Sequence, residues 1–295
     1  MSFRLTFLLG LLSVLHAGSA YALPHPGGVP NLSQAEWSRI PATEIRASAA
    51  VDFTAIIALS NCSGGLVRFE GSLSTDPAMV LTNGHCLDEG FLSPGTVMVN
   101  RPVFRSLRLL RSDGKASLGS LRAARVIYAT MTKTDMALYG LQETYDDIEK
   151  NYGVRALTLS SRHPVAGRQI TIPSGYWKKI YQCSIDRFVH ELREDKWTWS
   201  DSILYKQPGC ATIGGTSGSP IIDTETYEVI GVNNTGNDTG GRCTMNNPCE
   251  VDEDGNVTVT RKASYGQEVY WIYGCLNSRN ELQLDKPGCQ LPSGR

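Results

Sequence analysis

The stretch GGTSGSP, residues 214–220, places the hydroxyl of Ser217 among three glycines and a closing proline. An ordinary turn needs only one or two such residues. A nucleophilic serine, in contrast, needs amide donors aimed at the oxyanion that forms when it attacks a carbonyl. Gly215 permits a backbone in which the amides of Gly215 and Ser217 face one point, and Gly218 adds no side chain on the far side. The stretch therefore predicts a nucleophile at Ser217 with an oxyanion hole formed by Gly215 and Ser217.

A serine hydroxyl also needs a base and a third group that holds the base. Three of the five histidines lie beyond residue 50: His85, His163 and His190. His85 lies in MVLTNGHC, where an apolar run ends in a glycine-containing turn followed by a cysteine. Asp135 begins the apolar run of TKTDMALYGL, where its carboxylate would be buried beside the imidazole. His85 and Asp135 are therefore the candidate partners of Ser217.

Short runs of β-branched and apolar residues fill the chain from residue 51, separated by glycine, proline, asparagine and aspartate. This pattern is typical of many short antiparallel strands. The runs form two groups of about six, which predicts an all-β protein with two packed six-stranded barrels, in residues 51–160 and 161–295, or one large sandwich. Apolar residues at helical spacing predict a C-terminal α-helix within 266–282. Its apolar face would carry Val269, Ile272, Tyr273 and Leu276.

The N-terminal segment has the layout of a secretory signal peptide in residues 1–22, with Arg4, an apolar run and small residues ending in AYA. The apolar run is shorter than the roughly 20 residues that a membrane span requires. Residues 23–50 are rich in proline, serine and alanine, which indicates a propeptide or a loosely attached arm. A net charge of -1 is typical of ordinary globular proteins rather than of strongly nucleic-acid-binding ones. We therefore expect an extracellular or periplasmic protein that binds neither nucleic acid nor, after signal cleavage, a membrane.

The cysteines are even in number, as expected where they pair in an oxidising compartment. They are Cys62, Cys86, Cys183, Cys210, Cys243, Cys249, Cys275 and Cys289. No two of them have CxxC spacing, and no histidine follows them in a zinc-ligand pattern. The acidic run CEVDEDGNVTV, residues 249–259, does not follow the ligand order of an EF-hand loop and predicts a β-hairpin turn at residues 254–256. These patterns predict disulfides and neither a bound metal nor a cofactor.

Together, LTNGHC, TDMALYGL and GTSGSP resemble the motifs of the chymotrypsin-fold serine endopeptidases, the trypsin-like superfamily. The resemblance extends from about residue 52 to the predicted C-terminal helix and implies two β-barrels with the active site between them. It implies that His85 is the general base, Asp135 its orienting acid and Ser217 the nucleophile, in that family's order. The segment NCSGGLVRF resembles the family's cysteine-glycine strand, which implies a disulfide between Cys62 and Cys86.

Within that superfamily, ATIGGTSGSPII and YEVIGVNN are most similar to the bacterial glutamyl-endopeptidase branch of the V8 type. The resemblance implies a substrate pocket lined by Ala211, Thr212, Asn233 and Asn234. Asn233 replaces the histidine that receives a substrate carboxylate in that branch, so a preference for glutamate is not implied. Ala211 replaces the aspartate by which trypsin binds basic residues, and a buried cation without a partner is costly. Thr216 replaces the aspartate of trypsin's activation switch, although removal of residues 23–50 would still unblock a zymogen.

The other cysteines are expected to pair with near neighbours in the sequence. The expected pairs are Cys243 with Cys249, Cys275 with Cys289 and Cys183 with Cys210, while Cys210 with Cys243 competes with the last of these. Spacing alone leaves this choice open.

Other enzymes that use a serine fit the chain less well. An α/β-hydrolase needs a histidine after its serine, and no histidine follows Ser217. In a subtilisin-like enzyme the serine begins a long helix, whereas SPIIDTETYEVIGV has the pattern of strand, turn and strand. We therefore expect a monomeric secreted serine endopeptidase with a polypeptide substrate and without trypsin-like specificity. The alternative is a secreted binding protein that retains the protease fold without activity.

Overall fold

The computed structural model describes residues 51–294. The predicted signal peptide, residues 1–22, and the predicted propeptide or arm, residues 23–50, lie outside the described residues. Within the described part, no helix is long and apolar enough to cross a membrane. The chain is mostly β-structure, and its strands form two sheets, one after the other along the sequence.

The first sheet closes on itself. Its strands are β1 (Ile56–Ala58), β2 (Ser63–Arg68), β3 (Pro77–Thr82), β4 (Val97–Leu110), β5 (Ser117–Thr130), β6 (Met136–Thr144) and β7 (Leu157–Thr158). The order is β1-β4-β5-β6-β3-β2, and antiparallel pairing of β1 with β2 completes a six-stranded ring. Strand β7 pairs in parallel with the outer edge of β2. This sheet is therefore a closed barrel rather than half of a sandwich.

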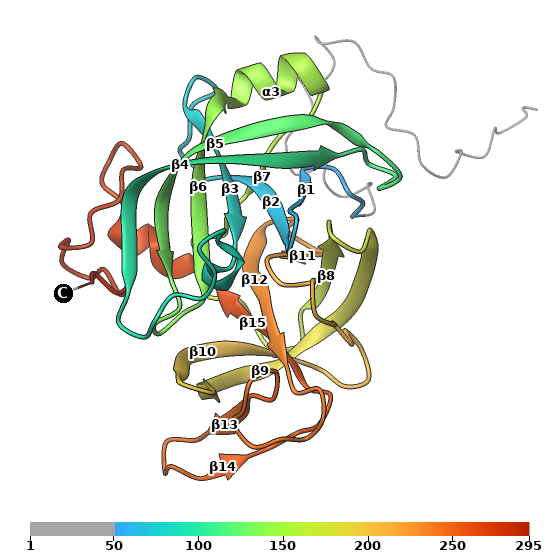
Figure 1. Ribbon diagram of the computed structural model, residues 1–295, viewed down its shortest axis with the longest axis vertical. Helices are drawn as coiled ribbons and strands as arrows, with labels where there is room; N and C mark the ends of the chain where they lie inside the picture. Colours follow the sequence, from blue (N-terminus) through green and yellow to red (C-terminus); the bar gives the residue numbers. More distant parts are fainter. Residues whose placement is uncertain (1–50, 295) are drawn as a thin grey trace, which may run out of the picture. The chain divides into compact units, whose positions relative to one another are not determined.

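The second sheet closes in the same way. Its strands are β8 (Gln169–Ser174), β9 (Lys179–Glu194), β10 (Trp197–Tyr205), β11 (Pro220–Asp223), β12 (Val229–Gly236), β13 (Cys249–Val251), β14 (Val257–Thr258) and β15 (Ser264–Glu268). The order β10-β15-β12-β11-β8-β9 is closed by the pairing of β9 with β10. Figure 1 shows the two barrels and the β13–β14 hairpin, which extends from the second barrel along β9. The all-β fold with two six-stranded barrels is confirmed, and the single sandwich is not found.

In each barrel, successive strand residues alternate between the interior and the exterior. In β4, for example, Arg105, Leu107 and Leu109 are buried, and the residues between them are exposed. The hairpin turn predicted at residues 254–256 joins β13 to β14, as expected. The Asp252 carboxylate accepts hydrogen bonds from the turn amides of Asp254 and Asn256. The acidic run therefore stabilises its own turn.

The C-terminal α-helix is the part of the predicted fold that was wrong. Residues 264–268 form strand β15, which pairs with β12, and only Tyr270–Cys275 are helical, as the 3-10 helix η2. Bonds from Ile272 N to Val269 O and from Leu276 N to Tyr273 O show the i to i+3 pattern. Apolar residues three apart serve a 3-10 turn as well as an α-helix, so their spacing alone did not distinguish the two.

An α-helix that the sequence analysis did not predict follows β6. Helix α3 (Tyr145–Tyr152) begins with a capping box, in which the Thr144 hydroxyl accepts from the amide of Asp147 and the Asp147 carboxylate accepts from the amide of Thr144. Gly153 ends the helix in the left-handed conformation. The capping signals were present in the sequence, but the helix is short and its apolar face is narrow.

Four disulfides staple the described chain. They join Cys62 to Cys86, Cys183 to Cys210, Cys243 to Cys249, and Cys275 to Cys289. These are the pairs expected from the family resemblance and from proximity in the sequence. The competing pair of Cys210 with Cys243 is not formed. Cys62–Cys86 fastens the start of β2 to the short 3-10 helix η1 (Gly84–Cys86), which carries His85.

Candidate active site

His85 is held at the end of β3 by a turn that only glycine permits. A Cβ on Gly84 would lie 2.1 Å from the carbonyl oxygen of Thr130, so a larger residue would displace this backbone. The backbone amide of His85 donates to Asp135 Oδ1 at 3.2 Å. Gly84 therefore lets the η1 turn lie directly against the segment that carries Asp135.

Asp135 orients the imidazole. His85 Nδ1 lies 2.8 Å from Asp135 Oδ2, and the Asp135 side chain is fully buried. A neutral imidazole that donates its Nδ1 proton to this carboxylate has a lone pair on Nε2. A base in this tautomer can accept a proton from a nucleophile on the Nε2 side.

Three effects set the pKa of His85. Burial lowers it, because the charged form is desolvated, whereas the charge and hydrogen bond of Asp135 and the charge of Glu194 raise it. The net pKa lies above the ordinary histidine value. The nearby carboxylates thus stabilise the imidazolium that a general base becomes when it accepts a proton.

Ser217 lies in a bend held by two glycines with positive φ, Gly215 at 87° and Gly218 at 80°. A Cβ on Gly218 would lie 2.1 Å from the carbonyl oxygen of Ser63, so this glycine is required for close contact with the first barrel. The Ser63 amide donates to the Ser217 carbonyl at 2.8 Å across the same contact. The run of small residues thus places Ser217 at the junction of the two barrels.

The Ser217 hydroxyl donates to the carbonyl oxygen of Asn234 at 3.1 Å. In the described residues, no hydrogen bond joins it to His85. The amides of Gly215 and Ser217 likewise donate to no acceptor within residues 51–294, whereas Thr216, between them, donates to Ile213 O. Both amides proposed for the oxyanion hole therefore remain without an acceptor in the fold itself.

One buried side chain connects the three segments that carry the predicted catalytic residues. Asn83 Nδ2 donates to the carbonyl oxygen of Asp135 at 2.7 Å, and Asn83 Oδ1 accepts from the amide of Gly218 at 2.6 Å. Asn83 is fully buried and is the residue two before His85. Its amide thus links the segments of the base, the acid and the nucleophile. Its two partners lie 52 and 135 positions away in the chain, so the local sequence does not indicate this role.

A buried arginine supports the histidine turn from inside the first barrel. Arg105 Nη1 donates to the Cys86 carbonyl at 2.7 Å and to the Tyr139 hydroxyl at 2.9 Å. Arg105 Nη2 donates to Asn61 Oδ1 and lies 2.9 Å from Asp88 Oδ1. Each partner satisfies part of the buried guanidinium. Nothing in the local sequence of β4 distinguished this arginine from its exposed neighbours.

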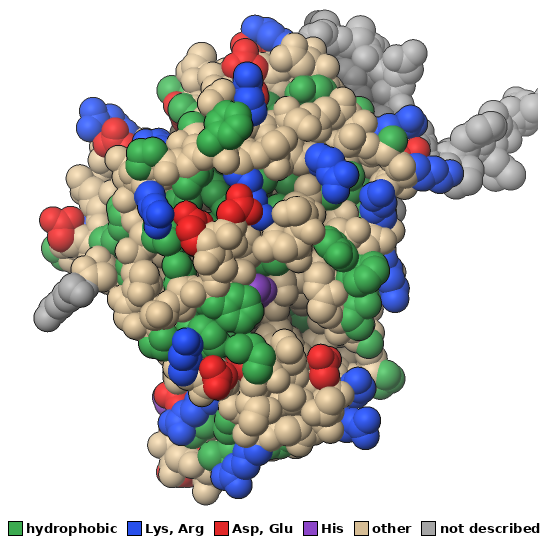
Figure 2. Space-filling model, viewed as in Figure 1, with side chains coloured by type: hydrophobic (Ala, Val, Ile, Leu, Met, Phe, Trp, Pro, Cys, Tyr) green, Lys and Arg blue, Asp and Glu red, His purple; other side chains and the backbone are tan. Residues whose placement is uncertain are grey.

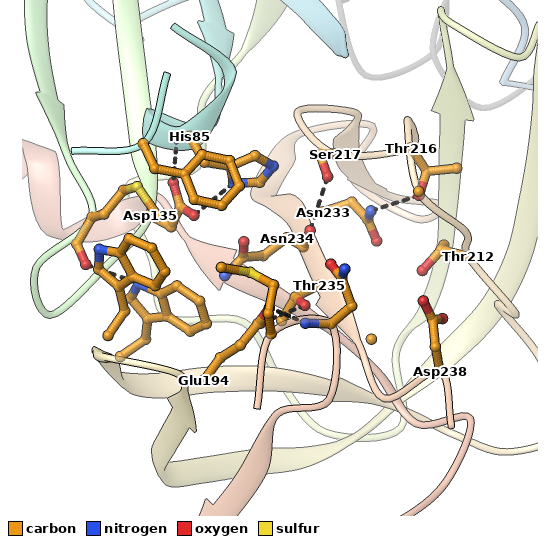
Figure 3. Close-up of a pocket in the computed structure, with 18 of the residues that line it drawn as sticks. His85, Asp135, Glu194, Thr212, Thr216, Ser217, Asn233, Asn234, Thr235 and Asp238 are labelled. Atoms are coloured by element: carbon orange, nitrogen blue, oxygen red, sulfur yellow. Dashed lines mark hydrogen bonds and ion pairs between the residues drawn. The ribbon is translucent and has the colours of Figure 1, made fainter. Parts of the chain in front are cut away.

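A single pocket brings the three predicted catalytic side chains together. It is lined by His85, Phe91, Met131, Asp135, Glu194, Trp197, Trp199, Thr212, Ile213, Gly214, Thr216, Ser217, Asn233, Asn234, Thr235, Gly236, Asp238, Met245 and Asn246. In Figure 3, His85 and Asp135 lie on one side, Ser217 and Asn234 near the middle, and Thr212 with Asp238 on the other side. Figure 2 shows a histidine side chain in a hollow at the middle of this face.

The predicted substrate-pocket residues differ in their positions. Thr212, Asn233 and Asn234 line the pocket, but Ala211 is exposed and does not line it. The Asn233 amide is used within the fold, because Oδ1 accepts from Tyr205 at 3.0 Å and Nδ2 donates to Thr216 Oγ1 at 3.1 Å. Asn234, in contrast, is buried and both polar atoms of its side chain lack a hydrogen-bond partner.

Glu194 is a pocket residue that sequence analysis missed. It ends β9, is 5% exposed, and accepts hydrogen bonds from Thr235 Oγ1 at 2.6 Å and from the amide of Asn246 at 2.7 Å. Burial raises its pKa, and the two hydrogen bonds only partly oppose this effect. No local pattern predicts such a site, because the partners come from β12 and from the loop before β13.

Indole rings of the second barrel complete the pocket wall. Trp197 Nε1 donates to Leu92 O at 2.8 Å and Trp199 Nε1 donates to Met131 O at 3.1 Å. Both acceptors belong to loops of the first barrel. The two tryptophans thus supply apolar surface beside His85 and fasten the barrels to each other.

One group of potential metal ligands lies at the site, formed by Cys62, His85 and Cys86. Both sulfurs are joined in a disulfide, so neither is available as a thiolate ligand. His85 is bonded to Asp135 through Nδ1. The donor set therefore does not fit a metal ion.

The chain is similar in structure to the active form of the Rv3671c protease from M. tuberculosis, at 15% identity over 85% of this chain and 88% of that chain, with a TM-score of 0.47. It is also similar to the MamO protease domain from Magnetospirillum magneticum, at 13% identity over 77% and 98%, with a TM-score of 0.46. A Glu endopeptidase in complex with MPD matches at 18% identity over 73% and 85%, with a TM-score of 0.40.

The search of curated protein sequences found no match. The family model described as the trypsin-like peptidase domain matches residues 62–232, which is more than half of the 295 residues. The matched segment begins at the first cysteine of the Cys62–Cys86 disulfide and ends in strand β12, so it contains His85, Asp135 and Ser217. The chain therefore belongs to the trypsin-like peptidase domain family.

Proposed function

We propose that this peptidase-family chain is a secreted serine endopeptidase that hydrolyses peptide bonds through His85, Asp135 and Ser217. The observation that carries the proposal is the buried His85–Asp135 pair facing the same pocket as Ser217, with the imidazole held by its Nδ1 atom. Such a base is ready to accept a proton on Nε2. The barrels would serve to hold these three side chains from different segments in one place.

The reaction would begin when Ser217 Oγ leaves the Asn234 carbonyl and gives its proton to His85 Nε2. Oγ then forms a bond to the peptide carbonyl carbon, and the carbonyl oxygen becomes an oxyanion that the amides of Gly215 and Ser217 can receive. Collapse of this intermediate breaks the C–N bond, and His85 returns the proton to the leaving amine. Water then attacks the acyl carbon while His85, again the base, takes a proton from it. The bond between this carbon and Ser217 Oγ breaks, and His85 returns the proton to Oγ.

The electrostatics of the pocket support a substrate that carries no negative charge near the scissile bond. No lysine or arginine lines the pocket in the described part of the chain, whereas Asp135, Glu194 and Asp238 do. A substrate carboxylate would lie among like charges without a cation to receive it. Our proposal is a relative of the V8 branch, which its serine motif and Thr212 resemble, without that branch's preference for glutamate. Small or apolar residues before the scissile bond fit the neutral amides and aromatic walls better.

The experiment that tests this proposal is cleavage of a diverse peptide mixture by the secreted, disulfide-intact protein, with product ends identified by mass spectrometry. We expect cleavage within peptides, mainly after small or apolar residues. Ser217→Ala should abolish it, and Ser278→Ala, which removes an exposed serine, should not. Cleavage mainly after glutamate would contradict the proposed specificity but not the reaction.

The compartment and the mature form are part of the same proposal. Four disulfides in the described residues are compatible with an extracellular or periplasmic location. We propose that residues 1–22 are removed on export, that residues 23–50 are a propeptide or arm, and that the mature enzyme is a monomer acting on polypeptides. N-terminal sequencing of the secreted protein and its mass in solution test these points. A retained N-terminus at Met1 would contradict export by a cleaved signal.

A further inference from the structure

A second cluster of titratable side chains lies on the second barrel and shares no residue with the active-site pocket. His163 precedes β8, Asp201 lies within β10, and Glu268 ends β15. Their nearest ligand atoms all lie within 4.8 Å of one another. His163 Nε2 is 3.2 Å from Asp201 Oδ2 and 3.1 Å from Glu268 Oε1. Three groups far apart in the sequence thus converge on one point.

The imidazole of His163 is held with its Nε2 atom toward the carboxylates. Nδ1 lies 2.6 Å from the carbonyl oxygen of Pro164, which can only accept, so Nδ1 carries the proton. The ring contacts Phe188 and Tyr270 edge to face, with centroids 4.4 and 5.2 Å away. A neutral imidazole in this tautomer presents a lone pair, not a donor, to Asp201 and Glu268. A histidine whose Nδ1–H is bonded to a backbone carbonyl is the usual form of a metal ligand.

Glu268 supplies a second and independent sign that a positive group belongs here. Its side chain is 1% exposed, and neither carboxylate oxygen accepts a hydrogen bond. Within residues 51–294, no lysine or arginine forms an ion pair with Glu268 or Asp201. A buried carboxylate without a hydrogen-bond donor or a cation is strongly unfavourable, and a second carboxylate, that of the partly exposed Asp201, lies close to Glu268.

The spacing of the three groups fits a tetrahedral ion. Zinc binds imidazole nitrogen and carboxylate oxygen at about 2.0–2.2 Å, which places neighbouring ligand atoms of a tetrahedron about 3.3 Å apart. The two distances from Nε2 are close to this value. Calcium and magnesium prefer all-oxygen ligands in larger number, so a nitrogen donor with two carboxylates favours a transition metal. Asp201 and His163 are partly exposed, which provides a path from solvent.

We propose that His163 Nε2, Asp201 and Glu268 bind a divalent transition-metal ion, with zinc as the best fit and water as the remaining ligand. The ion would fasten the segment between the two barrels to strands β10 and β15 of the second barrel. Its role would be structural, because the three ligands line no part of the active-site pocket. Sequence spacing predicts no metal, since these residues are distant in the chain and none of them is a cysteine.

The test uses the mature, disulfide-intact protein carrying Ser217→Ala to prevent self-digestion, after removal of metal with a chelator. Titration with Zn²⁺ by calorimetry should show one site, and the thermal unfolding midpoint should rise as the site fills. His163→Gln and Glu268→Gln should each weaken binding by about 10- to 100-fold or more, since loss of a ligand costs at least as much as loss of its supporting partner. His190→Gln removes an exposed histidine outside the cluster and should bind as the parent does.

A spectroscopic readout makes the result independent of stability. Co²⁺ in place of Zn²⁺ should produce the intense visible absorption of a tetrahedral site in the parent and in His190→Gln, and not in His163→Gln. Absence of binding by the parent would overturn the proposal, as would binding that survives both ligand variants. If Asp201 and Glu268 instead share a proton, Glu268→Gln will unfold at the parent's temperature or higher, and Zn²⁺ will shift neither protein; this outcome also overturns it.

Discussion

His85 and His163 both lie beside buried carboxylates, but the two imidazoles present different nitrogens to them. At His85 the carboxylate of Asp135 bonds Nδ1, so Nε2 faces the active-site pocket. At His163 the backbone oxygen of Pro164 bonds Nδ1, so Nε2 faces Asp201 and Glu268. The first arrangement suits a base that must accept a proton from a neighbour, and the second suits a ligand. Residue type alone does not distinguish them.

The two clusters also differ in how their carboxylates are satisfied. Both oxygens of Asp135 have partners, one on the imidazole and one on the amide of His85. Neither oxygen of Glu268 accepts a hydrogen bond. A buried charge with partners can remain fixed through a reaction, whereas one without partners requires an added cation or a proton. The comparison supports the proposed catalytic role of the first cluster and the proposed metal ion at the second.

The largest expected effect separates the clusters by activity. Ser217→Ala or His85→Ala should lower kcat/KM by several orders of magnitude, about 10⁴- to 10⁶-fold by the precedent of other serine triads. His190→Gln should not change it, because this exposed histidine belongs to neither cluster. Steady-state hydrolysis of a peptide identified as a substrate measures the effect. Near-normal hydrolysis by Ser217→Ala would remove the basis for assigning the first cluster to catalysis.

The next largest effect is expected when one carboxylate of each cluster is replaced by an amide. Asp135→Asn should lower kcat about 10⁴-fold, since the amide no longer holds the imidazole in the required tautomer. Asp201→Asn should instead weaken Zn²⁺ binding. Parallel measurement of kcat and of zinc affinity on both variants checks the contrast. Equal losses of kcat in the two variants would show that the clusters are not functionally distinct.

A smaller effect is expected at Asn83, which connects the catalytic segments without contacting substrate. Asn83→Ala leaves the buried Asp135 carbonyl without this donor and leaves the Gly218 amide with the Asn233 carbonyl as its acceptor, at a cost of about 1–3 kcal/mol in the free energy of unfolding. Activity should fall about 10- to 100-fold at temperatures where the variant is folded, because the three segments are less firmly placed. Denaturant unfolding and kcat measure the two losses.

Asn83→Asp provides the matched variant, since it keeps the acceptor for Gly218 and loses the donor to Asp135. Because it also buries a carboxylate against the Asp135 carbonyl, it should be at least as unstable as Asn83→Ala. If both substitutions leave stability and kcat unchanged, Asn83 does not position the site.

The smallest effect concerns the second carboxylate of the active-site pocket. The charge of Glu194 helps to raise the pKa of His85, because it stabilises the imidazolium. Glu194→Gln should lower this pKa, so the neutral base persists to more acidic conditions. The acidic limb of the kcat/KM profile should then move to lower pH. A limb that stays in place or moves to higher pH would contradict this influence on His85.

Sequence reasoning correctly predicted the features that depend on residues close together in the chain. Gly84, Gly215 and Gly218 lie next to His85 and Ser217 in the sequence and so could be recognised there, although the contacts that require Gly84 and Gly218 are made with the distant backbone of Thr130 and Ser63. Strand alternation and turn residues likewise indicated two barrels. The C-terminal helix was mispredicted because a period of three also satisfies the 3-10 helix Tyr270–Cys275.

What sequence reasoning missed depends on contacts between distant segments. Asn83 acts through residues 52 and 135 positions away, and Arg105 acts through the turn that follows His85. Glu194 lines the pocket at the end of β9, where it accepts a hydrogen bond from Thr235 of the distant strand β12. Asn233 lines the pocket, as expected, but its side-chain amide also forms hydrogen bonds with Tyr205 and Thr216 that the sequence did not indicate. These roles depend on contacts that exist only in the folded barrels, so the sequence alone does not indicate them.

The most direct measurement of the central claim is covalent labelling by a serine-directed phosphonate, followed by mass spectrometry of the modified peptide. In mature protein with intact disulfides, the account predicts one label, on Ser217, that is lost in Ser217→Ala, persists in Ser278→Ala and forms much more slowly in His85→Ala. Absence of label on Ser217 in folded, mature protein would contradict it and would favour a binding protein that keeps the peptidase fold.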